Sequence, residues 1–319
     1  MPKFYLVTGS TGFIGRSLVR ALLKQGHKVR SFDNDSRGSK ILLNDVKDDI
    51  EFITADIRDL AAVKEATKDI DCVCHLAYIN GTQTFYEKPV QILDIATKGM
   101  LNVLEACIEN KVPELALASS PEAYQAASII PTDETVGLSV PDPLNARFSY
   151  GGGKIICELL AINYGREYFD KVTIFRPHSV YGPKMGNAHV IPQLVNRIKP
   201  LLSSNPVVKL PIQGDGSETR SFCYIDDCIQ GILITMDRGE HLNIYHIGNE
   251  EEVTIAKLAE KIGAVFGKVV RIIPGPLQPG STLRRCPDIR KIKALGYNPT
   301  TNLDRGLRLT IEQSIEVPV

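Results

Sequence analysis

Two residues whose side chains can exchange protons, Tyr150 and Lys154, stand four positions apart near the middle of the chain. This spacing places both side chains on one face of a helix, about one turn apart. The pKa of a free tyrosine is about 10 and must fall by about 3 before the phenol can act as a base near neutral pH. An ammonium group about 4 Å away supplies about 4 kcal/mol at an effective dielectric constant of about 20, which is enough. The pair predicts a site of proton transfer.

Three consecutive glycines at positions 151–153 separate these two residues. Glycine in place of alanine weakens a helix by about 1 kcal/mol per position, so three of them are unfavourable in a first helical turn. The pattern indicates that another group approaches the backbone closely there, and a cofactor or a sugar is the expected group. Local flexibility without a ligand is the alternative.

The first predicted strand runs directly into a glycine-rich turn, in which Gly9, Gly12 and Gly15 are spaced three apart before a helix. In a dinucleotide-binding turn, the first glycine permits the tight turn and the second lets a pyrophosphate approach the backbone. The third lets the helix and the strand pack closely, and the N-terminus of the helix faces the anion. Taken alone, the pattern is also compatible with an ordinary strand-to-helix turn.

Acidic residues after the next two strands favour NAD over NADP. Asp33, 18 residues after Gly15, can accept hydrogen bonds from both hydroxyls of an adenine ribose and would repel a 2′-phosphate. Arg37 and Lys40 favour NADP, but they stand several residues beyond the strand. Asp56 is placed to meet the adenine edge, and its alternative role is that of a helix N-cap.

Short apolar runs alternate with helical patterns through the first half of the chain. This alternation predicts an α/β fold of Rossmann type, a doubly wound parallel sheet covered by helices. The predicted strands are Lys3–Val7, Val29–Phe32, Glu51–Thr54, Cys72–Leu76, Leu115–Ala118 and Val172–Phe175. From about Arg176 onward, prolines and glycines interrupt the chain, so a second, smaller mixed α/β lobe is expected.

The predicted division assigns residues 1–177, with about 213–247, to an NAD-binding domain, and residues 178–212 and 248–319 to a substrate-binding lobe. Arg220–Ile225 is a candidate strand that returns to the sheet, followed by a helix from about Asp226. Val253–Phe266 and Asp288–Leu295 are predicted helices of the smaller lobe.

The composition describes an ordinary globular chain and argues against several partners. Of the 319 residues, 43% are apolar and 23% are charged, and Lys+Arg equals Asp+Glu at 37 each. With no net charge and no basic run, nucleic acid is not an expected partner. No apolar run reaches the about 18 residues needed to cross a bilayer, which predicts a cytoplasmic protein without a membrane span. The seven scattered cysteines fit reduced core thiols better than a metal site, and no metal is expected.

An ordered set of motifs extends over nearly the whole chain. It comprises Thr8–Gly15, Asp33-Asn34 with Ser36–Gly38, Asp56, His75–Ala77, Ser119-Ser120 before Tyr124, Tyr150–Lys154, Arg176-Pro177 with Val180–Pro183, Gly214–Asp226 and Gly280–Asp288. In combination these motifs resemble the extended short-chain dehydrogenase/reductase family, in its NAD-dependent nucleotide-sugar epimerase, dehydratase and decarboxylase branch.

The resemblance implies NAD as the cofactor and a nucleotide-diphosphate sugar as the substrate. The positions that match cofactor contacts are Gly9, Thr11, Gly12, Phe13, Ile14, Gly15, Asp33, Asn34, Asp56, Ile57, Leu76, Ala77, Tyr150 and Lys154. Tyr150 matches the acid/base. Lys154 matches the residue that holds the nicotinamide ribose and lowers the tyrosine pKa. Ser120 matches the hydroxyl that binds and polarises the reacting sugar oxygen.

The implied substrate contacts are Ser120, Glu122, Ser179, Arg220 and Arg285. The two arginines match basic positions that bind the nucleotide diphosphate, for which a guanidinium group is well suited.

Three positions depart from the family pattern. Ser179 replaces an asparagine that contacts a substrate phosphate, Tyr78 replaces a small residue near the cofactor, and Ala96 stands where the family often has asparagine. These changes are expected to reshape the pocket.

The implied chemistry is the transfer of a hydride from a sugar carbon to NAD while Tyr150 takes the hydroxyl proton. The favoured prediction is a nucleotide-sugar 4-epimerase that acts through a transient 4-keto sugar. Glu122 stands where dehydratases and decarboxylases of this branch carry a catalytic glutamate, but Pro121 stands where dTDP-glucose dehydratases carry an aspartate. Dehydration or decarboxylation is therefore the alternative.

Two further possibilities are a net 4-oxidation or reduction and a dinucleotide-binding sensor without catalysis. The resemblance also implies a homodimer, in which the helical stretches Ile92–Ile108 and Lys154–Tyr168 pair across a two-fold axis.

Overall fold

The computed structural model of the chain describes residues 1–202, 206–276 and 282–315. Its largest element is a seven-stranded sheet with the order β11-β6-β5-β4-β1-β2-β3, in which every pair of neighbours is parallel. The strands are β1 (Phe4–Thr8), β2 (Lys28–Asp33), β3 (Ile50–Thr54), β4 (Cys72–His75), β5 (Glu114–Ala118), β6 (Lys171–Pro177) and β11 (Asn243–Ile247). The predicted doubly wound α/β fold is confirmed, and six of the seven strands overlap predicted ones.

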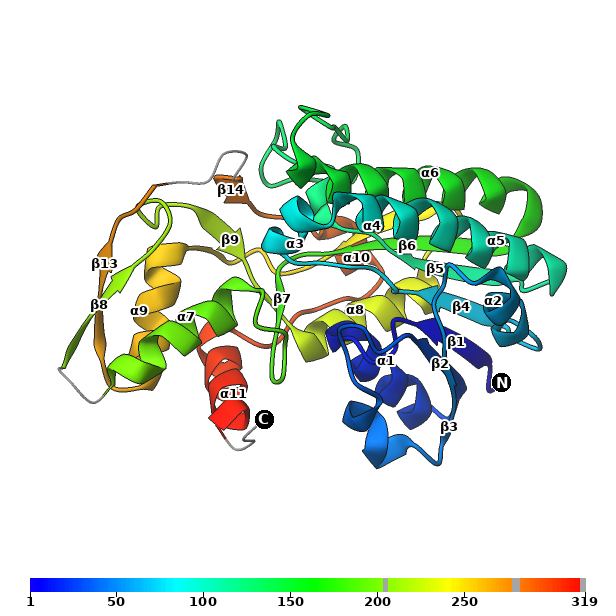
Figure 1. Cartoon of the computed structure of the whole chain (residues 1–319), viewed down its shortest axis with the longest axis horizontal. Coiled ribbons are helices and arrows are strands. Elements are labelled where there is room, and N and C mark those ends of the chain that lie inside the picture. The colour runs from blue at the N-terminus through cyan, green and yellow to red at the C-terminus, as the bar shows by residue number, and fades with distance from the viewer. Residues whose placement is uncertain (203–205, 277–281, 316–319) are drawn as a thin grey trace.

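Helices cover both faces of this sheet (Figure 1). One face carries α1 (Phe13–Lys24) and α8 (Ile225–Arg238), and the other carries α2 (Leu60–Ala66), α4 (Pro89–Asp94), α5 (Met100–Glu109) and α6 (Ser149–Tyr168). A π-helical turn, η2 (Ile95–Gly99), joins α4 to α5. Each helix buries one apolar stripe; α1, for example, buries Leu18, Val19 and Leu22 against the sheet.

The strand order reverses at β1, which lies between β2 and β4. Strands added after β1 therefore extend the sheet in opposite directions, and their connections leave a crevice outside the carboxyl ends of β1 and β4. Doubly wound sheets bind ligands at this switch point. The same edge carries the residues that follow β5 and β6, so it is where the predicted site should lie.

The remaining strands form three small sheets. These pair β8 (Val207–Pro211) with β13 (Val269–Ile273), β7 (Val180–Tyr181) with β10 (Cys223–Tyr224), and β9 (Thr219–Ser221) with β12 (Glu252–Thr254) and β14 (Arg284–Arg285). Three helices accompany them, α7 (Val190–Ile198), α9 (Ile255–Val265) and α11 (Leu303–Ile315), whereas α10 (Arg290–Ala294), predicted as a helix of the smaller lobe, packs against β11 of the large sheet. Figure 1 shows β8, β13, α7, α9 and α11 together at the end of the molecule away from β1 to β5.

Short helices complete the chain: α3 (Thr82–Glu87) and the 3-10 turns η1 (Lys40–Val46), η3 (Pro121–Ala123), η4 (Ala146–Phe148) and η5 (Lys199–Leu201). Gly280, where the last family motif begins, lies outside the described residues.

The prediction that Arg220–Ile225 returns to the large sheet is wrong. This segment divides into β9 and β10, which pair with strands of the small sheets. The seventh strand of the large sheet is instead β11, which pairs with β6 from Asn243↔Thr173 to Ile247↔Pro177. Its polar residues Asn243 and His246 interrupt the apolar run that marks a buried strand, so periodicity alone did not reveal it.

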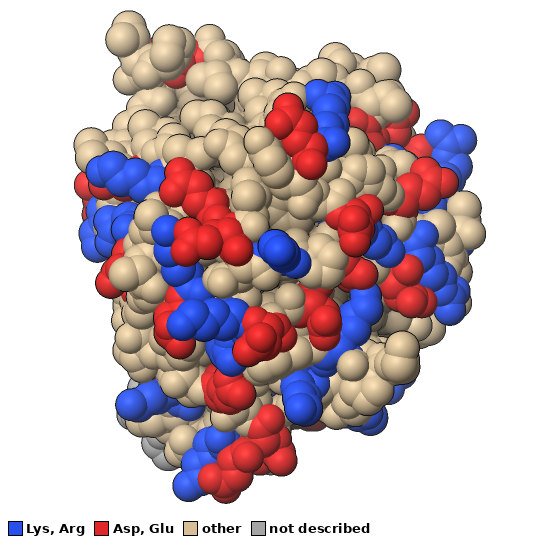
Figure 2. All heavy atoms as spheres, turned by 90° about the vertical axis from the view of Figure 1, so that its right-hand side faces the viewer, with Lys and Arg blue, Asp and Glu red and all other residues tan. Residues whose placement is uncertain are grey.

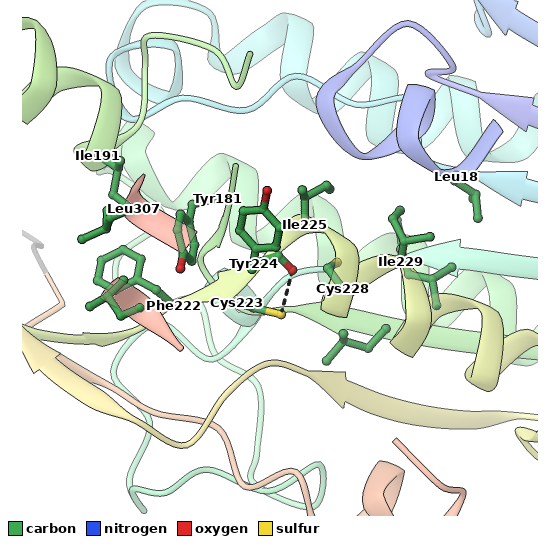
Figure 3. Close-up of a cluster of buried hydrophobic side chains, with 14 of the residues drawn as sticks. Leu18, Tyr181, Ile191, Phe222, Cys223, Tyr224, Ile225, Cys228, Ile229 and Leu307 are labelled. Atoms are coloured by element: carbon green, nitrogen blue, oxygen red, sulfur yellow. Dashed lines mark hydrogen bonds between the residues drawn. The ribbon is translucent and has the colours of Figure 1, made fainter. Parts of the chain in front are cut away.

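One apolar core extends from the large sheet to the smaller sheets (Figure 3). Leu18 of α1 and Ile229 of α8 lie at one end of the cluster, and Ile191 of α7 and Leu307 of α11 lie at the other. Between them, Tyr181 packs edge to face against Phe222 and Tyr224, with ring centroids 6.1 and 5.6 Å apart. This continuous packing fixes the smaller sheets relative to the large one, as a site built from both requires.

Charges of both signs are interspersed on the face shown in Figure 2, with no extended basic patch there. Within the described ranges, no helix is long and apolar enough to cross a membrane.

Candidate active site

A cleft lies at the switch point, at the carboxyl ends of β1, β2 and β4. Eight predicted cofactor residues line it: Gly9, Gly12, Asp33, Asn34, Asp56, Ile57, Leu76 and Ala77. The other lining residues are Phe32, Ser36, Arg37, Gly38, Ala55, Tyr78, Ile79 and Ile95. Of these eight residues, only Tyr78 was predicted to lie near the cofactor, although Ser36–Gly38 belongs to one of the family motifs.

The glycine-rich turn approaches its neighbours too closely for larger side chains. Gly9 has a φ of 71°, and a Cβ atom there would lie 2.7 Å from the backbone nitrogen of Ala77. A Cβ atom on Gly15 would overlap the backbone oxygen of Gly9. These contacts support the predicted roles of Gly9 in the turn and of Gly15 in helix–strand packing.

The residues of this turn fit a dinucleotide phosphate. Among the described residues, the hydroxyls of Ser10 and Thr11 are buried without a hydrogen-bond partner, and Gly12, which lines the cleft, places no side chain in front of the N-terminus of α1. Buried hydroxyls are normally paired, so two unpaired ones beside an open helix N-terminus fit an anionic ligand. The predicted cofactor contacts Thr11, Phe13, Ile14 and Gly15 belong to this turn and to the start of α1 but do not line the cleft itself.

Asp33 lies at the end of β2, as predicted for a ribose-binding carboxylate. It accepts hydrogen bonds from the backbone nitrogens of Thr11 (3.0 Å) and Asp35 (2.9 Å), so it also ties two loops together. Asp56 accepts a hydrogen bond from the Asn34 amide at 2.9 Å. Hydrogen bonds from Arg58 hold the pKa of Asp56 well below its usual range, so this carboxylate is ionised.

Tyr150 and Lys154 lie buried on one face of α6, near the cleft. The Ser120 side chain lies close enough to the Tyr150 phenol to lower its pKa, and the Tyr150 ring stacks on Phe85 with centroids 4.5 Å apart. Lys154 Nζ donates a 2.7 Å hydrogen bond to the backbone oxygen of Ala118 and lies 6.0 Å from the centroid of the Tyr150 ring. The structure thus brings together Ser120, Tyr150 and Lys154, three of the four predicted catalytic side chains, while no sequence pattern indicated Phe85.

The expected lowering of the tyrosine pKa is not what the structure shows. Burial raises the pKa of Tyr150 above its ordinary value, and the Ser120 hydrogen bond and the Arg37 charge only partly oppose it. Burial also lowers the pKa of Lys154 to about 8. The predicted lowering of the pKa included the attraction of the Lys154 ammonium. It left out the desolvation of the Tyr150 phenol, which has the larger effect on this pKa.

The three glycines of α6 are explained mainly by the protein itself. A Cβ atom on Gly151 would lie 2.5 Å from the backbone oxygen of Glu122, and one on Gly153 would overlap the Tyr78 hydroxyl. At Gly152 the nearest atom, a methyl carbon of Val140, would be 3.4 Å away. The predicted close approach is therefore present at two of the three positions, but protein groups make it.

Glu122 lies among three arginines next to the catalytic pair. Arg285 donates a 2.7 Å hydrogen bond to its carboxylate, and Arg147 and Arg220 interact with it electrostatically. Burial alone would raise the pKa of Glu122, but Arg285 and the two other arginines hold it below its usual value. The predicted residues Glu122, Arg220 and Arg285 thus form one cluster. Arg147, three residues before Tyr150, was not predicted.

The cluster has more positive than negative charge. Burial and the neighbouring Arg285 lower the pKa of Arg220 to about 10. Among the residues that the structure describes, the Arg147 Nε atom is buried without a hydrogen-bond partner. Buried guanidinium groups are normally paired, so this arrangement fits an anionic ligand.

Ser179, the other predicted substrate contact, lies between β6 and β7 with a φ of 38°. Its backbone oxygen accepts a hydrogen bond from Cys223 at 3.3 Å. A residue other than glycine in this left-handed conformation is uncommon, and such residues concentrate at functional sites.

A buried polar chain supports the site from behind. Glu158, one turn after Lys154 on α6, pairs with Arg176, which donates to the Tyr124 hydroxyl. The Tyr124 hydroxyl in turn hydrogen-bonds His246 Nε2 at 2.8 Å, and the His246 ring packs against His178 with centroids 4.7 Å apart. Neither ring nitrogen of His178 has a partner among the described residues. This chain links the carboxyl ends of β5, β6 and β11 under the catalytic helix.

The parallel sheet has a cleft at its switch point, lined by the glycine-rich turn and Asp33, and a buried Tyr-x-x-x-Lys pair lies nearby. These features define a dinucleotide-dependent enzyme of the Rossmann class. The comparison with known proteins agrees. The chain belongs to the NAD dependent epimerase/dehydratase family, whose model matches residues 5–248. It is an enzyme of this family, and NAD is its cofactor.

Relatives with three different reactions resemble the chain over nearly its whole length. A UDP-N-acetyl-alpha-D-glucosaminuronate decarboxylase of Bacillus cytotoxicus is 29% identical, and the alignment covers 99% of each chain. A putative UDP-glucose 4-epimerase of Methanocaldococcus jannaschii is 30% identical over 96% of each chain. The crystal structure of DesIV, a dTDP-glucose 4,6-dehydratase of Streptomyces venezuelae with NAD bound, superposes with a TM-score of 0.88 at 26% identity, covering 98% of this chain and 97% of that one.

Proposed function

We propose that this protein is a nucleotide-sugar 4-epimerase that acts through a transient 4-keto sugar. The observation that carries the proposal is the juxtaposition of Ser120, Tyr150 and Lys154, all three buried and close to the dinucleotide cleft. A hydroxyl and a phenol paired in this way can together hold one sugar hydroxyl and move its proton. The similarity to a putative UDP-glucose 4-epimerase supports the same reading.

In this proposal the glycine-rich turn, Asp33 and the residues after β4 would hold NAD, which would supply the acceptor for a hydride. Ser120 orients the sugar hydroxyl toward the Tyr150 oxygen. Tyr150 takes the hydroxyl proton when the sugar carbon is oxidised and returns it when the carbon is reduced on its other face. Lys154, held by the Ala118 oxygen, keeps a positive charge near Tyr150, which favours the phenolate that must be present before the proton is taken and again after it is returned.

The arginine cluster is the proposed binding site for the nucleotide diphosphate. Arg147, Arg220 and Arg285 outnumber the two carboxylates that interact with Arg220, those of Glu122 and Glu218. A diphosphate carries about two negative charges at neutral pH and accepts bidentate hydrogen bonds from guanidinium groups. Binding it would balance the excess positive charge of this cluster.

The state of Glu122 favours epimerisation over dehydration. Elimination of water needs a group that donates a proton to the leaving hydroxyl. Arg285 keeps Glu122 ionised, so this carboxylate is poorly prepared to act as an acid. A 4-epimerase needs only Ser120, Tyr150 and Lys154 for proton transfer. It requires no carboxylate there.

Decarboxylation is the second candidate, and Arg147 is the observation that favours it. Its unpaired, buried Nε atom beside Glu122 would suit a carboxylate on the sugar. The similarity to a UDP-N-acetylglucosaminuronate decarboxylase points the same way.

The test is to incubate the purified protein with NAD and a panel of nucleotide sugars, neutral and C6-carboxylated, and to follow product mass and configuration. Unchanged mass with inverted configuration at C4 supports the epimerase. Loss of carbon dioxide from the carboxylated substrates refutes the epimerase and supports the decarboxylase. Loss of water refutes both candidate functions. The Tyr150→Phe variant serves as the control for conversion by any contaminating enzyme.

A further inference from the structure

Tyr78, which follows β4, contacts both members of the catalytic pair. Its ring lines the dinucleotide cleft. Lys154 Nζ lies 3.9 Å from the centroid of this ring, over its face. The Tyr150 ring meets it at right angles, with an interplanar angle of 89° and centroids 5.2 Å apart. Tyr78 is thus closer to the ammonium than Tyr150 is, since the Lys154–Tyr150 distance measured in the same way is 6.0 Å.

The space for this ring depends on two small residues. A Cβ atom on Gly153 would overlap the Tyr78 hydroxyl and lie 2.9 Å from the Ala96 Cβ atom. A larger residue at position 153 would therefore require the Tyr78 ring to move. Tyr78 and Ala96, which both depart from the family pattern, are the side chains that a Cβ atom on Gly153 would meet.

The ring of Tyr78, rather than its hydroxyl, is the part suited to a role. The hydroxyl oxygen is buried and has no partner among the described residues. Burial raises the pKa of Tyr78 above its ordinary value, so the hydroxyl keeps its proton. An unpaired buried hydroxyl is unfavourable, which indicates that the ring contributes something in return.

Lys154 needs a second stabilising contact. Its ammonium is buried, and the only hydrogen bond described for it is the one to the Ala118 oxygen. The titratable groups around it are His75 of β4, Tyr78, and Tyr150, Cys157 and Glu158 of its own helix. The face of an aromatic ring attracts a cation through its quadrupole, most strongly where water is excluded.

We propose that Tyr78 is a positioning residue for catalysis, whose ring face holds the Lys154 ammonium beside Tyr150 in space made by Gly153 and Ala96. The inference rests on the proposed function only for the roles of Tyr150 and Lys154 in the reaction. The contact between Tyr78 and Lys154 can be tested without substrate.

The first test changes the electronic character of the ring at nearly constant size. Position 78 is replaced by phenylalanine, by its mono- and trifluoro derivatives, and by leucine. We expect kcat within about threefold of wild type for phenylalanine, a stepwise fall with added fluorine, and about a tenfold loss for leucine, because fluorine weakens the ring quadrupole. Equal kcat values for phenylalanine and its trifluoro derivative would overturn the proposal, since a purely structural role depends on ring size alone.

The second test observes Lys154 in the cofactor-free protein by NMR titration of its ammonium group. Loss of the ring face should destabilise the charged form, so the pKa of Lys154 should fall in the Tyr78→Leu variant and stay near the wild-type value in Tyr78→Phe. An unchanged titration in Tyr78→Leu would refute the contact. If wild type converts no nucleotide sugar at all, the proposed function fails, while this titration still decides the inference.

The third test examines the match between Tyr78 and Gly153. Gly153→Ala should lower Tm in the wild-type background and lower it less in the Tyr78→Phe background, where the nearest ring atom is 3.6 Å from the new methyl carbon. Gly152→Ala is the matched control, because its methyl group meets only Val140 at 3.4 Å. An equal loss of Tm for Gly153→Ala in both backgrounds would show that Tyr78 and Gly153 are not matched.

Discussion

Arg285 donates a 2.7 Å hydrogen bond to the carboxylate of Glu122, although 163 positions separate the two residues in the chain. Both side chains are largely buried, with 13% and 19% of their surfaces exposed. The ion pair connects β14, in the smaller sheets, to the turn after β5 that carries Ser120. It therefore places the proposed diphosphate site next to the proposed proton-transfer site.

Replacing Glu122 by glutamine distinguishes the two candidate reactions. For an epimerase, we expect kcat to stay within about threefold of wild type, because the carboxylate takes no proton. For a decarboxylase that uses this carboxylate as an acid or base, the loss should be at least about 100-fold. Rates of product formation decide between the two reactions. Arg285→Lys keeps the positive charge but loses the two-pronged guanidinium group, so it controls for disruption of the Glu122–Arg285 ion pair.

The glycines of α6 should respond unequally to alanine. Gly152→Ala should leave stability unchanged or raise it by up to about 1 kcal/mol, because alanine favours helix and the methyl group finds space. Gly151→Ala should be destabilising by about 1–3 kcal/mol, since its methyl group would meet the Glu122 backbone. Urea denaturation of the two variants measures this difference. Equal stabilities would mean that the close approach at Gly151 is absent.

Cofactor choice should depend on Asp33. Its carboxylate lines the cleft at the end of β2, where it would repel a 2′-phosphate. We expect Asp33→Ser to raise NADP affinity relative to NAD affinity by at least about tenfold. Calorimetric titration of both cofactors checks this, with Asp49→Ser, an exposed carboxylate before β3, as the control. An unchanged affinity ratio would remove Asp33 from the ribose site.

Acid should destabilise the protein through its buried histidines. Burial lowers the pKa of His246 to about 3 and places that of His178 well below the ordinary 6.5. The unfolded chain therefore binds more protons between about pH 6.5 and the folded pKa values, so stability falls as pH decreases through this range.

Replacing His178 by phenylalanine removes one of these groups. The decline in unfolding free energy between pH 6 and pH 4 should become less steep by up to about 1.4 kcal/mol per pH unit. Urea denaturation at several pH values measures the slope. A slope identical to that of wild type would show that His178 is already protonated in the folded state.

Local patterns were sufficient for much of this molecule. The alternation of apolar runs and helices predicted the parallel sheet, and the glycine spacing located the turn around Gly9. The strand β11 was missed because Asn243 and His246 look polar in sequence, and only pairing with β6 explains their positions. Periodicity reports which residues are apolar, not which polar residues a neighbouring strand will bury.

The site was predictable where a motif fixes the spacing and not where the fold brings distant residues together. Tyr150 and Lys154 lie on one helix, so their proximity followed from their separation of four. The Phe85 ring on Tyr150, the Arg147 side chain beside Glu122 and the Tyr78 ring under Lys154 depend on tertiary contacts. The pKa of Tyr150 was misjudged for the same reason, because its burial is a property of the folded chain.

The most direct test of the account follows the hydrogen at C4 of the sugar. A nucleotide sugar labelled with deuterium at C4 is mixed with the NAD-loaded protein in a single turnover, and the cofactor is analysed for deuterium by mass spectrometry. We predict that deuterium enters the cofactor in wild type, and that Tyr150→Phe binds NAD but slows this transfer by at least about 100-fold. Product formed without deuterium ever reaching the cofactor, or transfer at the wild-type rate in Tyr150→Phe, would contradict the account.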